Sequence, residues 1–204
     1  MELEETLESK INRSDYKILI VDDVVSNVLL LKILLTNEKF QVCTANCGNA
    51  CIEVAKKELP DLILLDVMMP DISGFDAAVI LKKDPATKDI PIIFLTALNT
   101  PQDLVHGFKV GASDFLTKPF NKEELVMRVM QQISLVAAKR IIEQQNRELI
   151  ATLNNRDKMY SVIAHDLIPI SSNLYVQNAL IKALARRELV ISGTFRSMAA
   201  RRIL

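Results

Sequence analysis

The most constraining feature of the sequence is a run of four aliphatic residues, Leu62 to Leu65, that ends at Asp66. A strand with consecutive apolar side chains is buried on both faces, as in the parallel sheets of α/β proteins. Pro70 and Gly74 follow closely and predict a loop. The run therefore predicts an inner strand that delivers a carboxylate to the carboxyl edge of a parallel sheet, where open α/β sheets bind their ligands.

Strand-like and helix-like segments alternate along the first part of the chain. Apolar runs predict strands at residues 16–21, 40–45, 62–66, 90–96 and 114–117. Stretches with helical spacing predict helices at residues 26–37, 48–59, 75–83 and 103–110, and Asn121 is placed to cap a further helix. This alternation predicts an α/β fold with a doubly wound five-stranded parallel sheet and right-handed crossovers.

The charge of this 204-residue chain is unevenly distributed, although its formal net charge is zero. Residues 1–120 contain 12 Lys or Arg against 18 Asp or Glu, and residues 121–204 contain 13 against 7. The asymmetry indicates two parts with different roles. With the polar N-terminus and the span of the strand signals, we expect a lead-in at 1–15, an α/β domain at 16–137 and a C-terminal helical extension at 138–204. The sequence shows no run of roughly 18 apolar residues and no signal-peptide pattern, so we expect a cytoplasmic protein without a membrane partner.

An apolar repeat of seven residues follows Met130, where the strand signals stop. The seam that it forms contains Leu135, Ile142, Leu149, Leu153, Tyr160 and Ile163. Such a repeat predicts a long helix with coiled-coil character and a homodimer formed through the C-terminal helices. Lys139 and Asn146 occupy seam positions that are usually apolar, so we expect the pairing to be weak. The alternative is a helix that packs back on its own domain.

Polar side chains stand at the carboxyl ends of four predicted strands. These residues are Asp22, Asp23, Asp66, Thr96 and Lys118. Because parallel strands bring their carboxyl ends to one edge of the sheet, we expect these side chains to lie close together. Three neighbouring carboxylates repel one another unless a cation lies among them, and their hard oxygens suit Mg²⁺. An ammonium and a hydroxyl suit phosphoryl oxygens, so the set predicts phosphoryl transfer onto a carboxylate.

Residues 16–137 resemble a response-regulator receiver domain of the CheY-like family. The resemblance rests on Asp22-Asp23, on the Asp66-Val67-Met68-Met69-Pro70-Asp71 loop with Gly74, on Thr96-Ala97 and on Lys118-Pro119. It implies a flavodoxin-like sheet of strand order 2-1-3-4-5 and a cis peptide bond between Lys118 and Pro119. It also implies a role in two-component phosphorelay signalling, with a sensor histidine kinase or a phosphotransfer protein as the partner.

The same resemblance implies a metal site around the phosphoacceptor. Asp66 would accept the phosphoryl group, and Mg²⁺ would be the cofactor. Asp23 and Asp66 would bind the ion directly, together with the backbone carbonyl of Met68, and Asp22 would act on it through water.

The resemblance further implies catalytic and switch roles for residues on the last two strands. Thr96 and Lys118 would bind the phosphoryl oxygens beside Asp66. Phe115 matches the aromatic position that, with Thr96, would respond to phosphorylation.

A second and shorter resemblance covers Arg156 to Leu167, which is similar to the H-box of a sensor histidine kinase dimerisation helix. In that family the histidine accepts phosphate from ATP and its acidic neighbour assists, which implies these roles for His165 and Asp166. The segment departs from the family pattern at Ile168-Pro169, and nothing downstream resembles an ATP-binding domain. Alternatives to a receiver with a helical output are therefore a histidine kinase fragment with His165 as a second phosphoacceptor, or a structural helix with a lone histidine.

The last segment of the chain, residues 181–204, is basic. Its charged residues are Lys182, Arg186, Arg187, Glu188, Arg196, Arg201 and Arg202. Charge alone allows contact with DNA, but no helix-turn-helix pattern is present. We expect a solvated basic face and no nucleic-acid partner.

Overall fold

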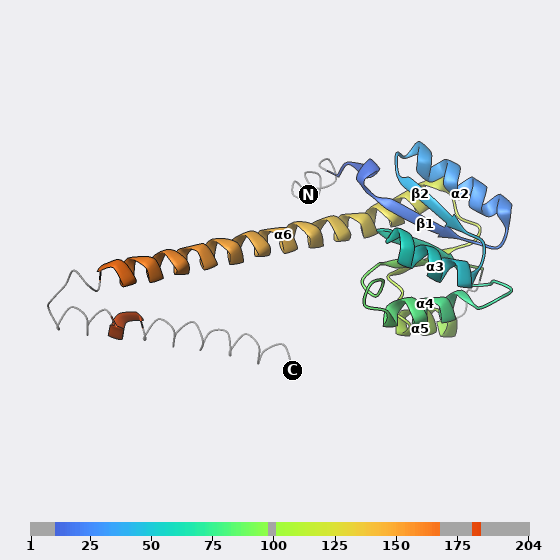
Figure 1. The fold of residues 1–204 in the computed structure, drawn as a ribbon. Helices are drawn as coiled ribbons and strands as arrows, with labels where there is room; N and C mark the ends of the chain where they lie inside the picture. The colour runs from blue at the N-terminus through green and yellow to red at the C-terminus, as the bar shows by residue number, and fades with distance from the viewer. Residues whose placement is uncertain (1–10, 98–100, 168–180, 185–204) are drawn as a thin grey trace. The chain divides into compact units, whose positions relative to one another are not determined.

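The computed structural model describes residues 11–97, 101–167 and 181–184, without the side chains of residues 101–104 and 162–167 (Figure 1). The chain divides into two compact units, residues 1–142 and 143–204. Residues 1–10 of the predicted lead-in, Ile168-Pro169 and the basic segment from residue 185 onward lie outside the described residues. The predicted domain bounds therefore stay predictions.

The N-terminal unit contains the predicted five-stranded parallel sheet, and its strand order is β2-β1-β3-β4-β5. The strands are β1 (Lys17–Val21), β2 (Gln41–Ala45), β3 (Leu62–Asp66), β4 (Ile92–Thr96) and β5 (Asp114–Thr117). The flavodoxin-like order 2-1-3-4-5 is thus confirmed. β3 and β4 are buried along their whole length, as their uninterrupted apolar runs predict.

Helices cover both faces of the sheet, with α2 on one side of β1 and β2 and α3 to α5 on the other (Figure 1). The helical elements are η1 (Arg13–Asp15), α2 (Val25–Asn37), α3 (Gly48–Glu58), α4 (Gly74–Lys83), α5 (Pro101–Lys109) and α6 (Lys122–Leu167). Strand residues alternate between the two layers. Ile18 and Ile20 lie in the core under α2 and α6, and Leu19 and Val21 lie in the core under α3 and α4.

Helix α6 starts inside the α/β unit. Its first turn carries Glu123 and Glu124, and the Glu124 N–H donates to the Asn121 side chain at 2.7 Å, as predicted for an N-cap. The face formed by Leu125, Val129, Ile133 and Ala137 is buried in the core below the sheet. For residues 125–137 the structure therefore agrees with the alternative prediction, in which the helix packs against its own domain. The predicted boundary at residues 137 and 138 lies within one continuous helix.

An ion pair fixes α6 at the amino edge of the sheet. The Arg140 guanidinium binds the buried Asp61 carboxylate, and its central carbon lies 5.3 Å from the centre of the Tyr16 ring. Asp61 also accepts the Lys17 backbone N–H at 2.7 Å. From residue 141 to residue 161 every residue is exposed. Among the helices described, none has the length and apolar character needed to cross a membrane.

Candidate active site at the carboxyl edge of the sheet

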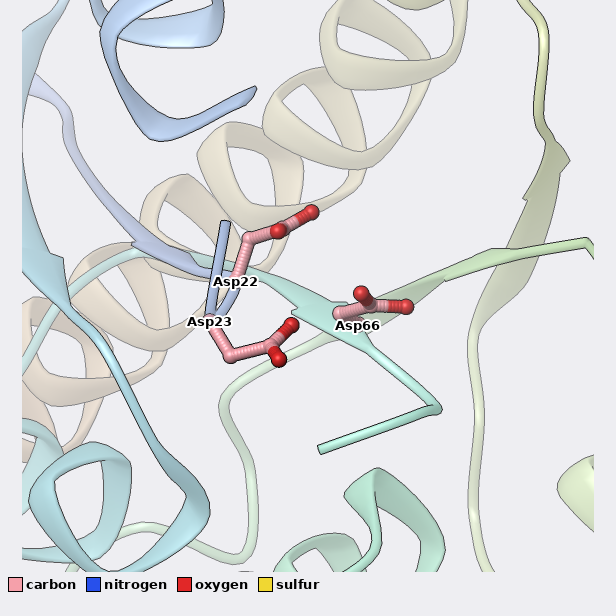
Figure 2. A group of neighbouring side chains, drawn as sticks. All are labelled: Asp22, Asp23 and Asp66. Atoms are coloured by element: carbon pink, nitrogen blue, oxygen red, sulfur yellow. The ribbon is translucent and has the colours of Figure 1, made fainter. Parts of the chain in front are cut away.

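Three carboxylates meet where β1 and β3 end. Asp22 and Asp23 directly follow β1, and Asp66 is the last residue of β3, which pairs with β1 in parallel. One oxygen from each carboxylate lies within 4.8 Å of the others, and Figure 2 shows the three side chains gathered at this edge. Asp22 and Asp66 are buried, whereas Asp23 is exposed. The sheet topology thus produces the predicted acidic cluster.

Lys118 bridges two of these carboxylates. Its Nζ donates to Asp22 Oδ2 at 2.7 Å and to Asp66 Oδ2 at 2.9 Å. Lys118 directly follows β5, its N–H bonds the Thr96 carbonyl at 2.8 Å, and the Lys118–Pro119 peptide is cis, as predicted. The ammonium is therefore held at the same edge of the sheet as the acidic cluster.

Burial and charge act in opposite directions on the ionisation of this cluster. Burial is the largest effect on Asp66 and raises the pKa of its carboxyl, although Lys118 opposes this and Asp22 adds to it. Burial also disfavours the charged form of Lys118, but the hydrogen bonds to the two aspartates and the attraction of their negative charges together outweigh burial and raise the pKa of Lys118. Lys118 is consequently an ammonium at neutral pH.

The other two predicted site residues lie on β4 and β5. Thr96 ends β4 and is buried. Phe115, which is 9% exposed, packs against Phe94 and Phe108 with ring centres 5.6 and 4.9 Å away. A Cβ on Gly107 would lie 2.3 Å from the Phe115 ring, so the absence of a side chain at Gly107 makes room for this inward orientation.

The loop after Asp66 is closed by short backbone contacts. The Gly74 N–H donates to the Val67 carbonyl at 2.9 Å, and a Cβ on Gly74 would lie only 2.1 Å from the Asp66 carbonyl oxygen. The Met68 N–H lies 3.4 Å from Asp66 Oδ1, and Met68 is 63% exposed. The Met68 backbone is therefore adjacent to the acidic cluster, while its side chain faces solvent.

Asp71 connects the same loop to helix α3. Its carboxylate accepts the N–H groups of Gly48 at 3.0 Å and Asn49 at 2.9 Å, at the start of the helix. These two bonds lower the pKa of the Asp71 carboxyl. The contact orients the loop that carries Met68.

We expect Asp71→Ala to lower the melting temperature at neutral pH. A carboxyl with a lowered folded-state pKa contributes stability above its unfolded pKa and loses it as the pH falls through the folded value. The difference between variant and parent should therefore shrink as the pH falls below about 4. Thermal melts across the acid range measure this, with the exposed Asp89→Ala as control. A difference that stays constant down to the lowest pH would contradict the charge-based explanation.

Sequence reasoning missed one residue of this site, Asn27. Its Nδ2 donates to both Asp22 oxygens, at 3.0 and 3.1 Å. The signal was a polar residue four positions after Asp23, in the first turn of a predominantly apolar helix. The contact needs the tertiary position of α2, so spacing alone does not reveal it.

The chemistry of the donor set fits Mg²⁺. Asp22, Asp23 and Asp66 offer only hard oxygen ligands, and the exposure of Asp23 leaves the cluster open to water. Among the described residues, one ammonium, that of Lys118, pairs with this group of three carboxylates, so the cluster keeps excess negative charge that a divalent cation would neutralise. The three carboxylates of Asp22, Asp23 and Asp66 could therefore hold the ion.

The second predicted phosphoacceptor is not part of this site as described. His165 and Asp166 lie near the end of α6, in the unit formed by residues 143–204, and their side chains are outside the described residues. The structure therefore gives no geometry for His165.

A parallel sheet of order 2-1-3-4-5 with three carboxylates and a lysine at its carboxyl edge defines the receiver class of α/β domains. Residues 18–130 match the family described as the response regulator receiver domain, and the chain belongs to this family. Receiver domains act in two-component signalling, where they take phosphoryl groups from histidine kinases or phosphotransfer proteins. The predicted class of protein is confirmed.

Curated relatives share the receiver part of the chain. The chain is 45% identical over 128 residues to the response regulator PleD of Caulobacter vibrioides, and this match covers 63% of the chain and 28% of PleD. It is 37% identical over 139 residues to the phosphate regulon transcriptional regulatory protein PhoB of Escherichia coli, covering 67% of this chain and 61% of PhoB. The chain thus spans less than two thirds of the length of these relatives.

Solved structures agree with the fold. The Vibrio cholerae chemotaxis protein CheY4 is 33% identical with a TM-score of 0.55, and the match covers 57% of this chain and 97% of CheY4. The receiver domain of the Pseudomonas aeruginosa sensor histidine kinase PA1611 is 28% identical with a TM-score of 0.53, covering 57% and 95%. That structure has a magnesium ion coordinated in its active-site cleft.

Proposed function

We propose that this protein is a phosphorylation-dependent switch in which Asp66 accepts a phosphoryl group from a partner histidine kinase or phosphotransfer protein. The observation that carries the proposal is the bridge from Lys118 to Asp22 and Asp66 within a cluster of three carboxylates. A buried, oriented carboxylate beside an ammonium provides a nucleophile and a charge partner for the transferring group.

The transfer would proceed by attack of one Asp66 carboxylate oxygen on the phosphorus of a donor phosphohistidine. The P–N bond would break and the imidazole would leave with its electron pair. Lys118 and Thr96 would bind phosphoryl oxygens, while Asp23 would bind Mg²⁺ directly and Asp22 would act on it through water. Asp23, Asp66 and the Met68 carbonyl would hold Mg²⁺, which would supply positive charge that neutralises the phosphoryl oxygens.

Incubation with acetyl phosphate tests this function. We expect the intact mass of the protein to increase by one phosphoryl group in the presence of Mg²⁺ and to stay unchanged in EDTA. Asp66→Asn should abolish the increase, whereas Asp89→Asn, which alters an exposed carboxylate, should leave it unchanged. Equal labelling of Asp66→Asn and the parent would overturn the assignment.

The output of the switch would run through α6. The helix begins at Lys122, shortly after the site residue Lys118, so a shift of Lys118 toward a phosphoryl group acts near the helix start. Reversing a two-state population from 1:99 to 99:1 needs about 5.5 kcal/mol. Lys118, Thr96 and nearby amides could donate charge-assisted hydrogen bonds to the phosphoryl group, each contributing about 1.5–3 kcal/mol. About two to four such bonds would supply this free energy.

The alternative of a histidine kinase fragment is not favoured by the comparisons. The family match ends at residue 130, well before His165. We therefore propose His165 neither as a phosphoacceptor nor as part of the switch. A cytoplasmic location and the absence of a nucleic-acid partner stay predictions.

Weak homodimerisation through α6 forms part of the proposal. Leu135, Ile142 and Leu149, the seam residues predicted from the sequence, are 61%, 58% and 57% exposed. These residues lie off the α6 face that the α/β core buries, so the seam is available to a second copy of the chain. A second copy with the same seven-residue repeat matches this seam along its length. Lys139, which the seam also contains, would keep the pairing weak.

We expect Ile142→Asp to increase the dimer dissociation constant at least about 100-fold, because two facing charges would replace the apolar contact that the proposed dimer buries at this position. Ile150→Asp is the matched control, since Ile150 is also 58% exposed on α6 but lies outside the seam. Sedimentation equilibrium of the full chain, with and without beryllofluoride as a phosphoryl mimic, measures the dissociation constant. An equal effect of both substitutions, or a parent that stays monomeric in both states, would contradict dimerisation through this seam.

A further inference from the structure

The buried Asp22 carboxylate depends on a neutral donor from helix α2. Asp22 is 0% exposed, and its Oδ1 accepts the Val24 N–H at 2.9 Å and Asn27 Nδ2 at 3.0 Å. Its Oδ2 accepts Asn27 Nδ2 at 3.1 Å and Lys118 Nζ at 2.7 Å. Each oxygen of Asp22 therefore has two donors, and Asn27 is the only residue that contacts both within the part of the chain described.

We propose that Asn27 is a positioning residue for the metal site: it holds Asp22 in the orientation that Mg²⁺ binding requires, independently of Lys118. The inference rests on the proposed function. Hydrogen-bond partners of metal-site carboxylates fix their orientation, and removing such a partner typically weakens metal binding about 10- to 100-fold.

The need for a second donor arises because Lys118 has two tasks. In the structure its ammonium is shared between Asp22 and Asp66. Once Lys118 turns to a phosphoryl oxygen, Asp22 loses its 2.7 Å contact with the ammonium. Without other donors its carboxylate would then be free to rotate. The two Asn27 contacts and the Val24 N–H remain, so the carboxylate keeps its orientation through the reaction.

The neutrality of Asn27 matters as much as its geometry. A lysine or arginine at this position would add positive charge to the cluster and compete with the cation. An aliphatic residue would leave a buried carboxylate short of donors, which is costly. An amide satisfies Asp22 and leaves the negative charge of the cluster available for Mg²⁺.

The surroundings of Asn27 allow a clean substitution. Asn27 lies in the wall of a cavity of about 390 Å³ between α2 and the segment that joins β5 to α6. The lining also includes Leu30, Leu31, Pro119 and Phe120, beside Asp22 and Lys118. Leucine has nearly the shape of asparagine and would meet apolar neighbours there. Asn27→Leu therefore removes the donor and keeps nearly the same side-chain volume.

Titration calorimetry with MgCl₂ on the full chain tests the proposal. We expect Asn27→Leu and Asn27→Ala to raise the Mg²⁺ dissociation constant about tenfold or more. The rate of labelling by acetyl phosphate should need correspondingly more Mg²⁺ to reach half its maximum, with the maximum itself within about twofold of the parent. Asn37→Ala, at the exposed end of the same helix, is the matched control.

The outcomes separate this proposal from the function on which it rests. If the parent binds no Mg²⁺, or Asp23→Asn binds it as well as the parent, the proposed metal site itself fails. If the parent binds Mg²⁺ and both Asn27 variants keep its affinity, the positioning role is refuted. A lower melting temperature without a change in Mg²⁺ affinity would likewise refute it, because that pattern marks a merely structural residue.

Discussion

Gly74→Ala is expected to abolish phosphorylation of Asp66 and to reduce the free energy of unfolding by about 3 kcal/mol. The added Cβ would lie 2.1 Å from the Asp66 carbonyl oxygen and 3.0 Å from Val67 Cα. Neither neighbour can rotate away, because both atoms belong to the backbone. The end of β3 or the start of α4 would have to move, and the Asp66 carboxylate would move with it.

Ser73→Ala provides the control for this prediction. Ser73 is the N-cap of α4, where its hydroxyl accepts the Asp76 N–H at 3.1 Å. Its loss should cost about 1 kcal/mol and leave labelling by acetyl phosphate unchanged. Urea denaturation and intact-mass measurements on both variants give the comparison. A Gly74→Ala protein that is labelled at the parental rate would show that the loop tolerates a shift in Asp66.

Lys118→Ala is expected to slow phosphorylation of Asp66 by about 10²- to 10³-fold at saturating Mg²⁺, the typical cost of removing one stabilising donor. It should also reduce the free energy of unfolding without Mg²⁺ by about 3 kcal/mol, because the buried Asp22 would lose its ionic partner. Mg²⁺ should then stabilise the variant more than it stabilises the parent, since the ion replaces the missing positive charge.

Lys122→Ala is the control for Lys118. Lys122 lies four residues further along the chain, pairs with Glu38 at 2.8 Å and has a 47% exposed side chain. Exposed pairs of this kind contribute little, so we expect a stability change within about 1 kcal/mol and an unchanged labelling rate. The labelling rates and the melting temperatures with and without Mg²⁺ provide the readout. A Lys118→Ala protein with a rate close to that of Lys122→Ala would contradict the assigned role of Lys118.

Much of the fold could be predicted from the sequence because its strands are short, apolar and regularly spaced. The uninterrupted run at residues 62–65 fixed the central parallel strand, and right-handed crossovers then limited the topology. The site followed from the same regularity, since residues at strand ends share one edge of the sheet. Asp22, Asp23, Asp66 and Lys118 were therefore predicted to meet, and the structure brings them together.

Contacts that depend on helix placement could not be predicted from the sequence. Arg140 binds Asp61, 79 residues away in the chain, and no local pattern relates the two residues. The contact of Asn27 with Asp22 spans only five residues, but it forms only in the orientation in which α2 follows the end of β1. The seven-residue repeat identified the exposed seam of α6 but not the separate face, including Leu125 and Val129, that the core buries.

The most direct test of the account is to locate the acyl phosphate in the chain. Borohydride reduces an aspartyl phosphate to homoserine, which peptide mass spectrometry assigns to a single position. After treatment of the full chain with acetyl phosphate and Mg²⁺, we predict homoserine at position 66 and unmodified aspartate at positions 22 and 23. Homoserine at Asp22 or Asp23, or phosphate on His165 with Asp66 unmodified, would contradict the central claim.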